Sequence, residues 1–229
     1  MKIGLLVCDE VSAEYQSNFG DYPEIFQALF PHYEFEFYAV YKNEFPISVL
    51  DCEIYMATGS SHSVYEDVDW IHQTKAFIRE IYARNLFFIG FCFGHQLMAE
   101  ALGGKVEKSS DGWCVGIHQF SIFNIKDWMR PAKTKVSFLM MCQDQVIVLP
   151  KNGVCLGGNK ACPNAIIQVG KRMMSIQGHP EFSKAYVQTL MKDRVNRIGA
   201  EKVKKGIASL TLSIDLELFR DWVEEFLKD

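Results

Sequence analysis

The stretch that decides the fold of this chain is Leu86-Phe87-Phe88-Ile89-Gly90-Phe91-Cys92-Phe93-Gly94. Its first part is an unbroken apolar run, which is typical of a strand buried on both faces of a sheet. Gly90 and Gly94 stand two residues before and two after Cys92, as in a sharp turn that leaves no room for side chains. The stretch therefore predicts a strand, a tight turn that carries a thiol, and a helix that begins at Phe93.

Cys92 is the candidate nucleophile of a catalytic site. A free cysteine is commonly a buried and inert side chain, but the two flanking glycines indicate a backbone that must approach another group closely. The positive end of the helix that begins at Phe93 would lie near the sulfur and favour the thiolate. We therefore predict that Cys92 is catalytic rather than structural.

A candidate base lies far downstream, in Gly178-His179-Pro180-Glu181. His179 follows an apolar run at a predicted strand end, and the strand ends of an open α/β sheet line its sites. The proline fixes the chain so that Glu181 can fold back onto the imidazole. His179 would take the thiol proton and return one to a leaving amine. A lone histidine is more often structural and Glu181 alone could be an exposed turn acid, but with Cys92 they predict a cysteine-dependent acyl-transfer enzyme.

The composition favours a globular protein and argues against several classes of partner. The chain has 229 residues, 48% of them hydrophobic, which is enough for a sizeable core. Its formal net charge is −4 and it has no long basic face, so we expect no nucleic-acid partner. The one basic cluster, at residues 202–205, is better explained as the solvated face of a helix. No apolar run approaches the ~18 residues that a membrane helix needs, so we expect no membrane association.

The seven cysteines indicate a reduced interior rather than a disulfide framework. Their number is odd and their spacing irregular, which favours a cytoplasmic protein. The apolar run at residues 3–7 is too short for a signal-peptide core and is followed by Asp9 and Glu10. The sequence has neither a Cys-x-x-Cys pair nor a His-Glu-x-x-His helix, so we predict no metal site, and we expect no cofactor.

Apolar runs and helical spacing place the elements along the chain. Strands are predicted at residues 3–7, 35–40, 54–57, 86–91, 115–125, 136–141, 146–149, 165–169 and 173–176. Helices are predicted at residues 22–30, 69–84, 93–102, 183–198 and 213–227, with a loop at 9–20.

This order of elements predicts an α/β fold. Strands and helices alternate up to about residue 105, which indicates a central, mostly parallel sheet with helices on both faces. The short β runs that follow predict an added antiparallel hairpin region and a return strand that leads into His179. No repeat or obvious linker interrupts the sequence, so we expect a single domain over residues 1–229.

Three motifs in this chain resemble those of the class I, or triad, glutamine amidotransferases. The motifs are Gly90-Phe91-Cys92-Phe93-Gly94-His95-Gln96, Gly103-Gly104 and Gly178-His179-Pro180-Glu181-Phe182. Further similarity lies at residues 58–65 and 143–146. The resemblance is strongest to stand-alone members similar to the glutaminase domain of GMP synthase and to the plant γ-glutamyl peptidases. It implies a flavodoxin-like fold of three layers.

The resemblance also implies a mechanism. Cys92 would attack the side-chain amide carbon of glutamine, ammonia would leave, and water would cleave the γ-glutamyl thioester that remains. His179 and Glu181 would complete a Cys-His-Glu triad. The backbone N–H groups of Phe93 and Gly59 would hold the oxyanion.

Substrate contacts follow from the same resemblance. Gln96 lies one helical turn beyond Cys92 on the same face, and the matching glutamine in the family contacts the substrate. Trp113 and Val115 lie in the segment that corresponds to the family's binding site for the amino-acid end of the substrate, which binds largely through its backbone. Trp113 could instead be a packing residue.

The chain departs from the family just before Gln143-Asp144. Relatives carry Ser-His there, whereas this chain has Met141-Cys142. The missing histidine is not part of the triad, so bond cleavage should survive. It lies where a partner domain or acceptor would be sensed, so coupling to a partner is in question.

Three functions stay open at this point. The first function is hydrolysis of glutamine, either alone or for a separate synthetase subunit that accepts the ammonia. The sequence contains no Gly-x-x-x-x-Gly-Lys-Ser/Thr loop for ATP binding, so activation of an acceptor would need that second polypeptide. Alternatively it would be a γ-glutamyl peptidase that applies the same chemistry to γ-glutamyl peptides or conjugates. The third function is a non-catalytic binding or regulatory module, and the intact triad argues against it.

Overall fold

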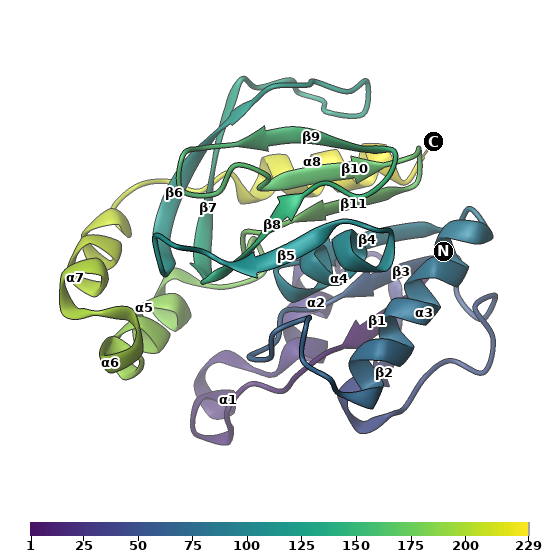
Figure 1. Cartoon of the computed structure of the whole chain (residues 1–229), viewed down its shortest axis with the longest axis horizontal. Helices are drawn as coiled ribbons and strands as arrows, with labels where there is room; N and C mark the ends of the chain where they lie inside the picture. Colours follow the sequence, from purple (N-terminus) through teal and green to yellow (C-terminus); the bar gives the residue numbers. More distant parts are fainter. Residues whose placement is uncertain (229) are drawn as a thin grey trace.

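The computed structural model describes residues 1–228 and has one large mixed sheet between two layers of helices (Figure 1). The strands are β1 (Lys2–Val7), β2 (Glu34–Ala39), β3 (Ile54–Ala57), β4 (Phe87–Phe91), β5 (Lys105–Lys108), β6 (Cys114–Ile122), β7 (Lys135–Cys142), β8 (Asp144–Val148), β9 (Gly153–Gly158), β10 (Ile166–Val169) and β11 (Met173–Ile176). The helices are α1 (Ala13–Phe19), α2 (Tyr22–Leu29), the short 3-10 helix η1 (Val40–Lys42), α3 (Asp69–Ala83), α4 (Phe93–Ala101), α5 (Lys184–Asp193), α6 (Val195–Ile198), α7 (Ala200–Ser209) and α8 (Leu216–Phe226).

The sheet has a parallel half and an antiparallel half. Its strand order is β2-β1-β3-β4-β11-β10-β9-β6-β7. Every pair from β2 to β11 is parallel, and every pair from β11 to β7 is antiparallel. Strands β5 and β8 form a separate antiparallel sheet of two strands. The prediction of a parallel sheet with an added antiparallel region is confirmed, and the antiparallel part continues the same sheet.

Both faces of the parallel half are buried, which explains the unbroken apolar strands. In β4, Phe87, Ile89 and Phe91 enter one core, whereas Phe88 enters the other. Successive side chains of a strand point to opposite faces, so a strand covered on both faces has no polar positions.

Each face has its own helices. Buried residues of α2, α5 and α8 belong to the first core, and those of α3 and α4 belong to the second. Figure 1 shows α3 on the near side of the sheet and α8 behind strands β9 and β10. In α8, Phe219 packs edge-on against Phe91 with ring centroids 5.9 Å apart, so the last helix lies over the strand that carries the elbow.

The predicted elements differ from the structure in a few places. The predicted loop at 9–20 contains helix α1, which buries no residue and therefore has no apolar period. The predicted helix 183–198 is divided at Arg194 into α5 and α6. Strands β5 and β9 were not predicted, because β5 is mostly exposed and polar and β9 is rich in glycine. The basic cluster at 202–205 lies on helix α7 with Lys204 and Lys205 exposed, as expected.

The helices and the cysteines were also the subject of predictions from composition. Within residues 1–228, no helix has both the length and the apolar character needed to cross a membrane. All seven cysteines are unpaired, and six of them are buried.

Candidate active site

The strand order brings three chain segments together at one edge of the sheet. Strands β3, β4 and β11 are adjacent and parallel, with Ala57 in register with Gly90 and Ile176 in register with Phe91. Their carboxyl ends therefore lie side by side, as in other open α/β sheets. The segments that follow these strands begin at Thr58, Cys92 and Gln177, and they carry the predicted site.

The elbow at Cys92 has the strained geometry that the glycines predict. Cys92 has a φ of 48°, a backbone angle that residues other than glycine rarely adopt. A Cβ added at Gly90 would lie 2.5 Å from the carbonyl oxygen of Gly94, and one added at Gly94 would overlap the carbonyl oxygen of Ala57. Close backbone contacts therefore require glycine at both positions. The turn between them holds the thiol at the N-terminus of helix α4.

His179 is held from several sides with its ring next to the elbow. Its backbone N–H donates to the carbonyl of Leu139 (2.8 Å), and its ring stacks on Phe182 with centroids 4.4 Å apart. Nδ1 lies 2.7 Å from Oε1 of Glu181, whose side chain is fully buried. Since a carboxylate only accepts, Nδ1 carries the proton of this hydrogen bond. Nε2 forms no hydrogen bond with any of residues 1–228.

Electrostatics favour a protonated His179 ring. Burial alone lowers the pKa of this imidazole. The negative charges of Cys92 and then of Glu181 more than reverse this effect and raise the pKa to about 10. The direction of this shift favours a ring with protons on both nitrogens. Glu181 keeps one carboxylate oxygen without a hydrogen-bond partner among the described residues.

The loop after β3 meets the elbow. A Cβ at Gly59 would lie 3.3 Å from Cε1 of His179 and 3.8 Å from Cβ of Cys92. Asp9 holds this loop by accepting hydrogen bonds from the backbone and the hydroxyl of Ser61, both 2.7 Å long. Among residues 1–228, the N–H groups of Gly59 and Phe93 donate to no acceptor, as two preorganised oxyanion donors require.

A chain of amides leads from Asp144 to the thiol. Gln96 donates from Nε2 to the backbone carbonyl of Asp144 (2.8 Å) and to Oε1 of Gln177 (3.1 Å). Gln177 in turn directs Nε2 at Sγ of Cys92, 3.5 Å away. Gln177 was not predicted as a site residue, although its place two residues before His179 was a usable signal. Gln96, predicted as a substrate contact, is engaged in this chain and also lines a cavity.

Cys92 lies where two cavities meet. The first cavity is lined by Gln96, Trp113, Asp144 and the cations Lys108, Arg194 and Arg197, besides Cys92. The second cavity is lined by Asp9, Tyr22, His179, Phe182, Tyr186 and Arg194, besides Cys92. The thiol is therefore accessible from two sides, although Cys92 is only 6% exposed.

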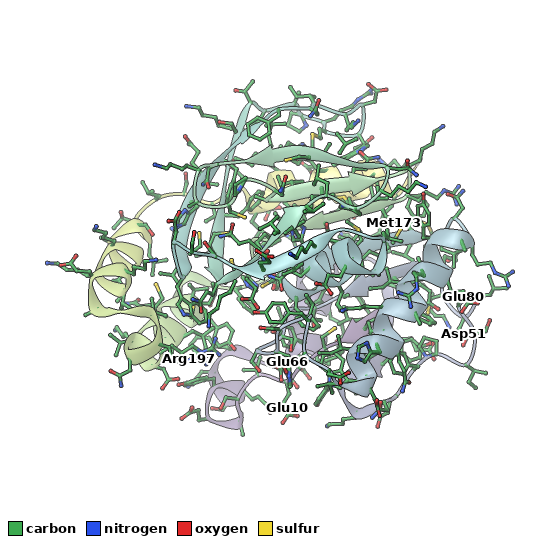
Figure 2. The ribbon with its side chains drawn as sticks, in the orientation of Figure 1. Glu10, Asp51, Glu66, Glu80, Met173 and Arg197 are labelled. Atoms are coloured by element: carbon green, nitrogen blue, oxygen red, sulfur yellow. The ribbon has the colours of Figure 1, made fainter. Side chains whose placement is uncertain are left out.

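The first cavity has an excess of positive charge. Arg197, labelled in Figure 2 and contributed by helix α6, lies over the ring of Trp113, 5.5 Å from its centroid. The Asp144 carboxylate accepts a short hydrogen bond of 2.5 Å from the hydroxyl of Ser63. The cations of the cavity can therefore meet an anionic group of a ligand.

Val115 does not join Trp113 in this cavity. Its side chain lies against helix α7, where a Cβ added at Gly206 would come within 3.0 Å of it. Its carbonyl accepts a hydrogen bond from His118 Nε2 (3.2 Å). The structure therefore gives Val115 a packing position behind the cavity wall, apart from the other predicted substrate contacts.

The unusual pair Met141-Cys142 lines the first cavity. Burial raises the pKa of the Cys142 thiol well above its ordinary value, and the nearby charge of Cys92 adds to this. Cys142 therefore stays a neutral thiol. Met141 and Cys142, which replace the Ser-His of the relatives, line the cavity beside Cys92. No group of three or more metal-ligating side chains occurs in the part of the chain that the structure describes.

Comparison with known proteins agrees with this geometry. A family model described as "Glutamine amidotransferase class-I" matches residues 59–196. The chain is 29% identical to γ-glutamyl peptidase 4 of Arabidopsis thaliana over 74% of this chain and 71% of that protein. It is 31% identical to the glutamine-hydrolysing GMP synthase of Azoarcus sp. over 55% of this chain and 25% of the synthase.

A solved structure reproduces the whole fold. The crystal structure of a glutamine amidotransferase from Thermotoga maritima superposes with a TM-score of 0.74 at 18% identity, covering 99% of each chain. At this identity the likeness establishes the fold, and the family model, which matches more than half of the chain, establishes the family. The protein belongs to the class I glutamine amidotransferases.

Proposed function

We propose that this protein is an enzyme that hydrolyses the γ-amide of glutamine or of a γ-glutamyl compound through a thioester on Cys92. The observation that carries the proposal is the convergence of the thiol, the His179 ring and the loop at Gly59 on one point at the junction of two cavities. The family supports hydrolysis of such amides in general.

The reaction would begin with attack of the Cys92 sulfur on the amide carbon. The C–S bond forms, and the carbonyl π electrons move to oxygen, where the N–H groups of Gly59 and Phe93 hold the oxyanion. The oxyanion's electron pair then re-forms the carbonyl as the C–N bond breaks, the electrons of that bond go to nitrogen, and His179 Nε2 supplies the proton. His179 next takes a proton from water, which cleaves the thioester and releases glutamate. Loss of one oxyanion donor would cost about 10²–10³-fold in rate.

The charge of the first cavity supports an orientation for the substrate. A γ-glutamyl group carries an α-carboxylate at the end remote from the reacting carbon. Arg197 and Lys108 would attract this carboxylate, and Trp113 would cover the methylene chain. The leaving amine would then lie toward the second cavity, which contains His179.

Glutamine is the first substrate to test, with glutamate and ammonia as products. A separate synthetase subunit would receive the ammonia if the reaction serves a synthesis, as the GMP synthase relative combines both activities in its name. A second candidate substrate, a γ-glutamyl peptide, is favoured by the second cavity, which provides space for a leaving group larger than ammonia. The plant γ-glutamyl peptidase relative supports the same choice.

The organisation of these residues fits one continuous domain. We propose a single domain over residues 1–229, because one sheet joins strands from both halves of the sequence and α8 packs behind it. Seven unpaired cysteines favour a reducing compartment such as the cytoplasm.

A substrate panel with mass detection of the acyl-enzyme tests the proposal. Glutamine, γ-glutamyl dipeptides and glutathione conjugates would be compared for turnover and for a γ-glutamyl adduct on Cys92. The expected result is turnover of at least one γ-glutamyl amide, an adduct on Cys92, and loss of both in Cys92→Ala. Absence of turnover and of labelling by an electrophilic glutamine analogue would favour a non-catalytic module instead.

A further inference from the structure

Tyr22 is a buried side chain at the site to which the triad chemistry gives no role. It is the first residue of α2, and the Asp21 cap accepts a hydrogen bond from its backbone N–H (2.8 Å). Its ring packs on Phe182, with centroids 6.1 Å apart, and Phe182 itself stacks on His179. The backbone cap and the aromatic contacts fix the direction of the phenol.

The hydroxyl of Tyr22 points at the reacting groups. It lies 3.2 Å from the position that a Cβ at Gly59 would occupy, the same point that is 3.3 Å from Cε1 of His179. Tyr22 is 7% exposed, and its hydroxyl is not among the buried polar atoms that lack a partner in residues 1–228, because Tyr22 lines the second cavity. The hydroxyl therefore faces the cavity beside the loop at Gly59 and is free to bond a group of the substrate.

The phenol remains neutral in this environment. Burial raises the pKa of Tyr22 well above its ordinary value, and the charges of Glu181, Asp9 and Cys92 act in the same direction. The hydroxyl can therefore both donate and accept a hydrogen bond, and it does not compete with His179 as an acid.

The position of Tyr22 decides which group of the substrate can reach its hydroxyl. Tyr22 lines the second cavity with His179 and does not line the first cavity, which has Gln96 and Trp113. The oxyanion has its own donors at Gly59 and Phe93. The remaining group of a γ-glutamyl amide that can reach the hydroxyl is the nitrogen that departs toward His179.

We propose that the Tyr22 hydroxyl accepts a hydrogen bond from the N–H of the departing amine and thereby turns the nitrogen lone pair toward His179. This inference rests on the proposed function. As the C–N bond breaks, its electron pair stays on nitrogen and the proton comes from His179 Nε2, while Tyr22 keeps its own proton. The hydrogen bond is strongest once His179 has protonated the nitrogen, because a cationic N–H is a stronger donor than an amide N–H, so it stabilises the departing amine more than the bound amide.

A pair of substrates that differ only in the leaving atom tests this role. γ-Glutamyl anilide has an N–H on its leaving nitrogen, whereas the γ-phenyl ester of glutamate has an oxygen with no proton to donate. The value of kcat/KM reports the steps through acylation for both. We expect Tyr22→Phe to lower the ratio of kcat/KM for the anilide to that for the ester by about tenfold, the effect of one lost hydrogen bond.

Tyr33→Phe is the matched control, because it removes a phenol whose partner is Glu224 on α8, away from the cavities. Its anilide-to-ester ratio should stay within twofold of the wild-type ratio. Labelling of Cys92 by the chloroketone analogue of glutamine, which has no departing amine, reports whether the thiol and the first cavity remain formed in Tyr22→Phe.

The outcomes separate the two proposals. An equal loss on anilide and ester, or no loss on either, overturns the role of Tyr22 and leaves the proposed function standing. If the wild-type protein cleaves neither substrate nor glutamine, and its thiol is not labelled, the proposed function fails and the role of Tyr22 fails with it.

Discussion

The two halves of the sheet contribute different things to the site. The parallel half ends in the thiol of Cys92, the ring of His179 and the loop at Gly59, all fixed by strand register and backbone contacts. The antiparallel half and helix α6 contribute Trp113, Met141-Cys142 and Arg197, which line the space around the thiol. We therefore expect bond cleavage to depend on the rigid strand edge, and substrate choice to depend on the attached region, which can vary without disturbing that edge.

The two halves also differ in how firmly their site residues are fixed. The elbow is constrained by backbone atoms that would clash with any added Cβ. Arg197 belongs to the short helix α6, which buries only Ile198, and Arg197 itself lies over Trp113. We therefore expect substitutions in the parallel half to lower kcat or stability, and substitutions in the antiparallel half to change KM and substrate preference.

The largest expected effect is that of Cys92→Ala. Without the sulfur no thioester can form, so turnover of any γ-glutamyl amide should fall by roughly 10⁵-fold or more. Steady-state rates and mass detection of the adduct would measure this loss. Cys155→Ala is the control, because Cys155 lies on β9 and lines neither cavity. Labelling of another cysteine in the Cys92→Ala protein would break the assignment of chemistry to the parallel half.

Glu181→Gln should lower kcat/KM by on the order of 10³–10⁴-fold, because an amide can offer Nδ1 a donor and favour the wrong tautomer. It should also move the alkaline limb of the pH profile. The pKa of His179 is lowered by burial and raised to about 10 by the charges of Cys92 and Glu181, so the acid that protonates the amine is lost above that pH. Removing one negative charge lowers this pKa, so the limb should shift to lower pH by about one unit.

Profiles of kcat/KM between pH 5 and 11 would measure the shift, since they report the free enzyme. Glu181→Asp keeps the charge and should retain more of the alkaline limb. An unchanged limb in Glu181→Gln would mean that the titrating acid is not His179.

Gly94→Ala should destabilise the fold by about 3 kcal/mol, because the new Cβ on helix α4 overlaps the backbone of Ala57 on β3, and neither the helix nor the strand can move freely. Urea unfolding of the variant and of wild type would measure the change. Gly103→Ala is the matched control: its φ is +87° but nothing lies within 4 Å of the new Cβ, so only strain of about 1 kcal/mol is expected. Equal effects at the two positions would argue against a rigid elbow.

The parallel half could be predicted from the sequence because its constraints are local. Unbroken apolar runs mark strands buried on both faces, and the glycines around Cys92 mark the turn, so the bounds of β3 and β11 match the predicted ranges. The place of His179 beside Cys92 then follows from β11 pairing with β4. The roles of these residues in catalysis stay predictions.

The contacts that sequence reasoning missed depend on pairings that no local pattern encodes. Gln177 reaches the thiol only because β11 lies beside β4, and Tyr22 reaches the loop at Gly59 only because α2 packs against Phe182. Arg197 enters the first cavity because the predicted long helix breaks at Arg194 and α6 takes a new direction. Exposed elements such as α1 left no apolar period to read.

The smallest expected effect sharpens the role of the antiparallel half. Arg197→Ala should raise KM for glutamine by about tenfold and change kcat by less than twofold, because a partly solvated cation that binds a carboxylate contributes about 1–2 kcal/mol to the ground state and transition state alike. The decisive comparison uses the α-amide of glutamine, which lacks the carboxylate. Wild type should prefer glutamine over this amide, and Arg197→Ala should lose most of that preference, whereas Arg79→Ala, on the exposed side of α3, should keep it. If Arg197→Ala lowers kcat and leaves KM and the preference intact, then α6 takes part in bond cleavage and the division between the two halves of the sheet does not hold.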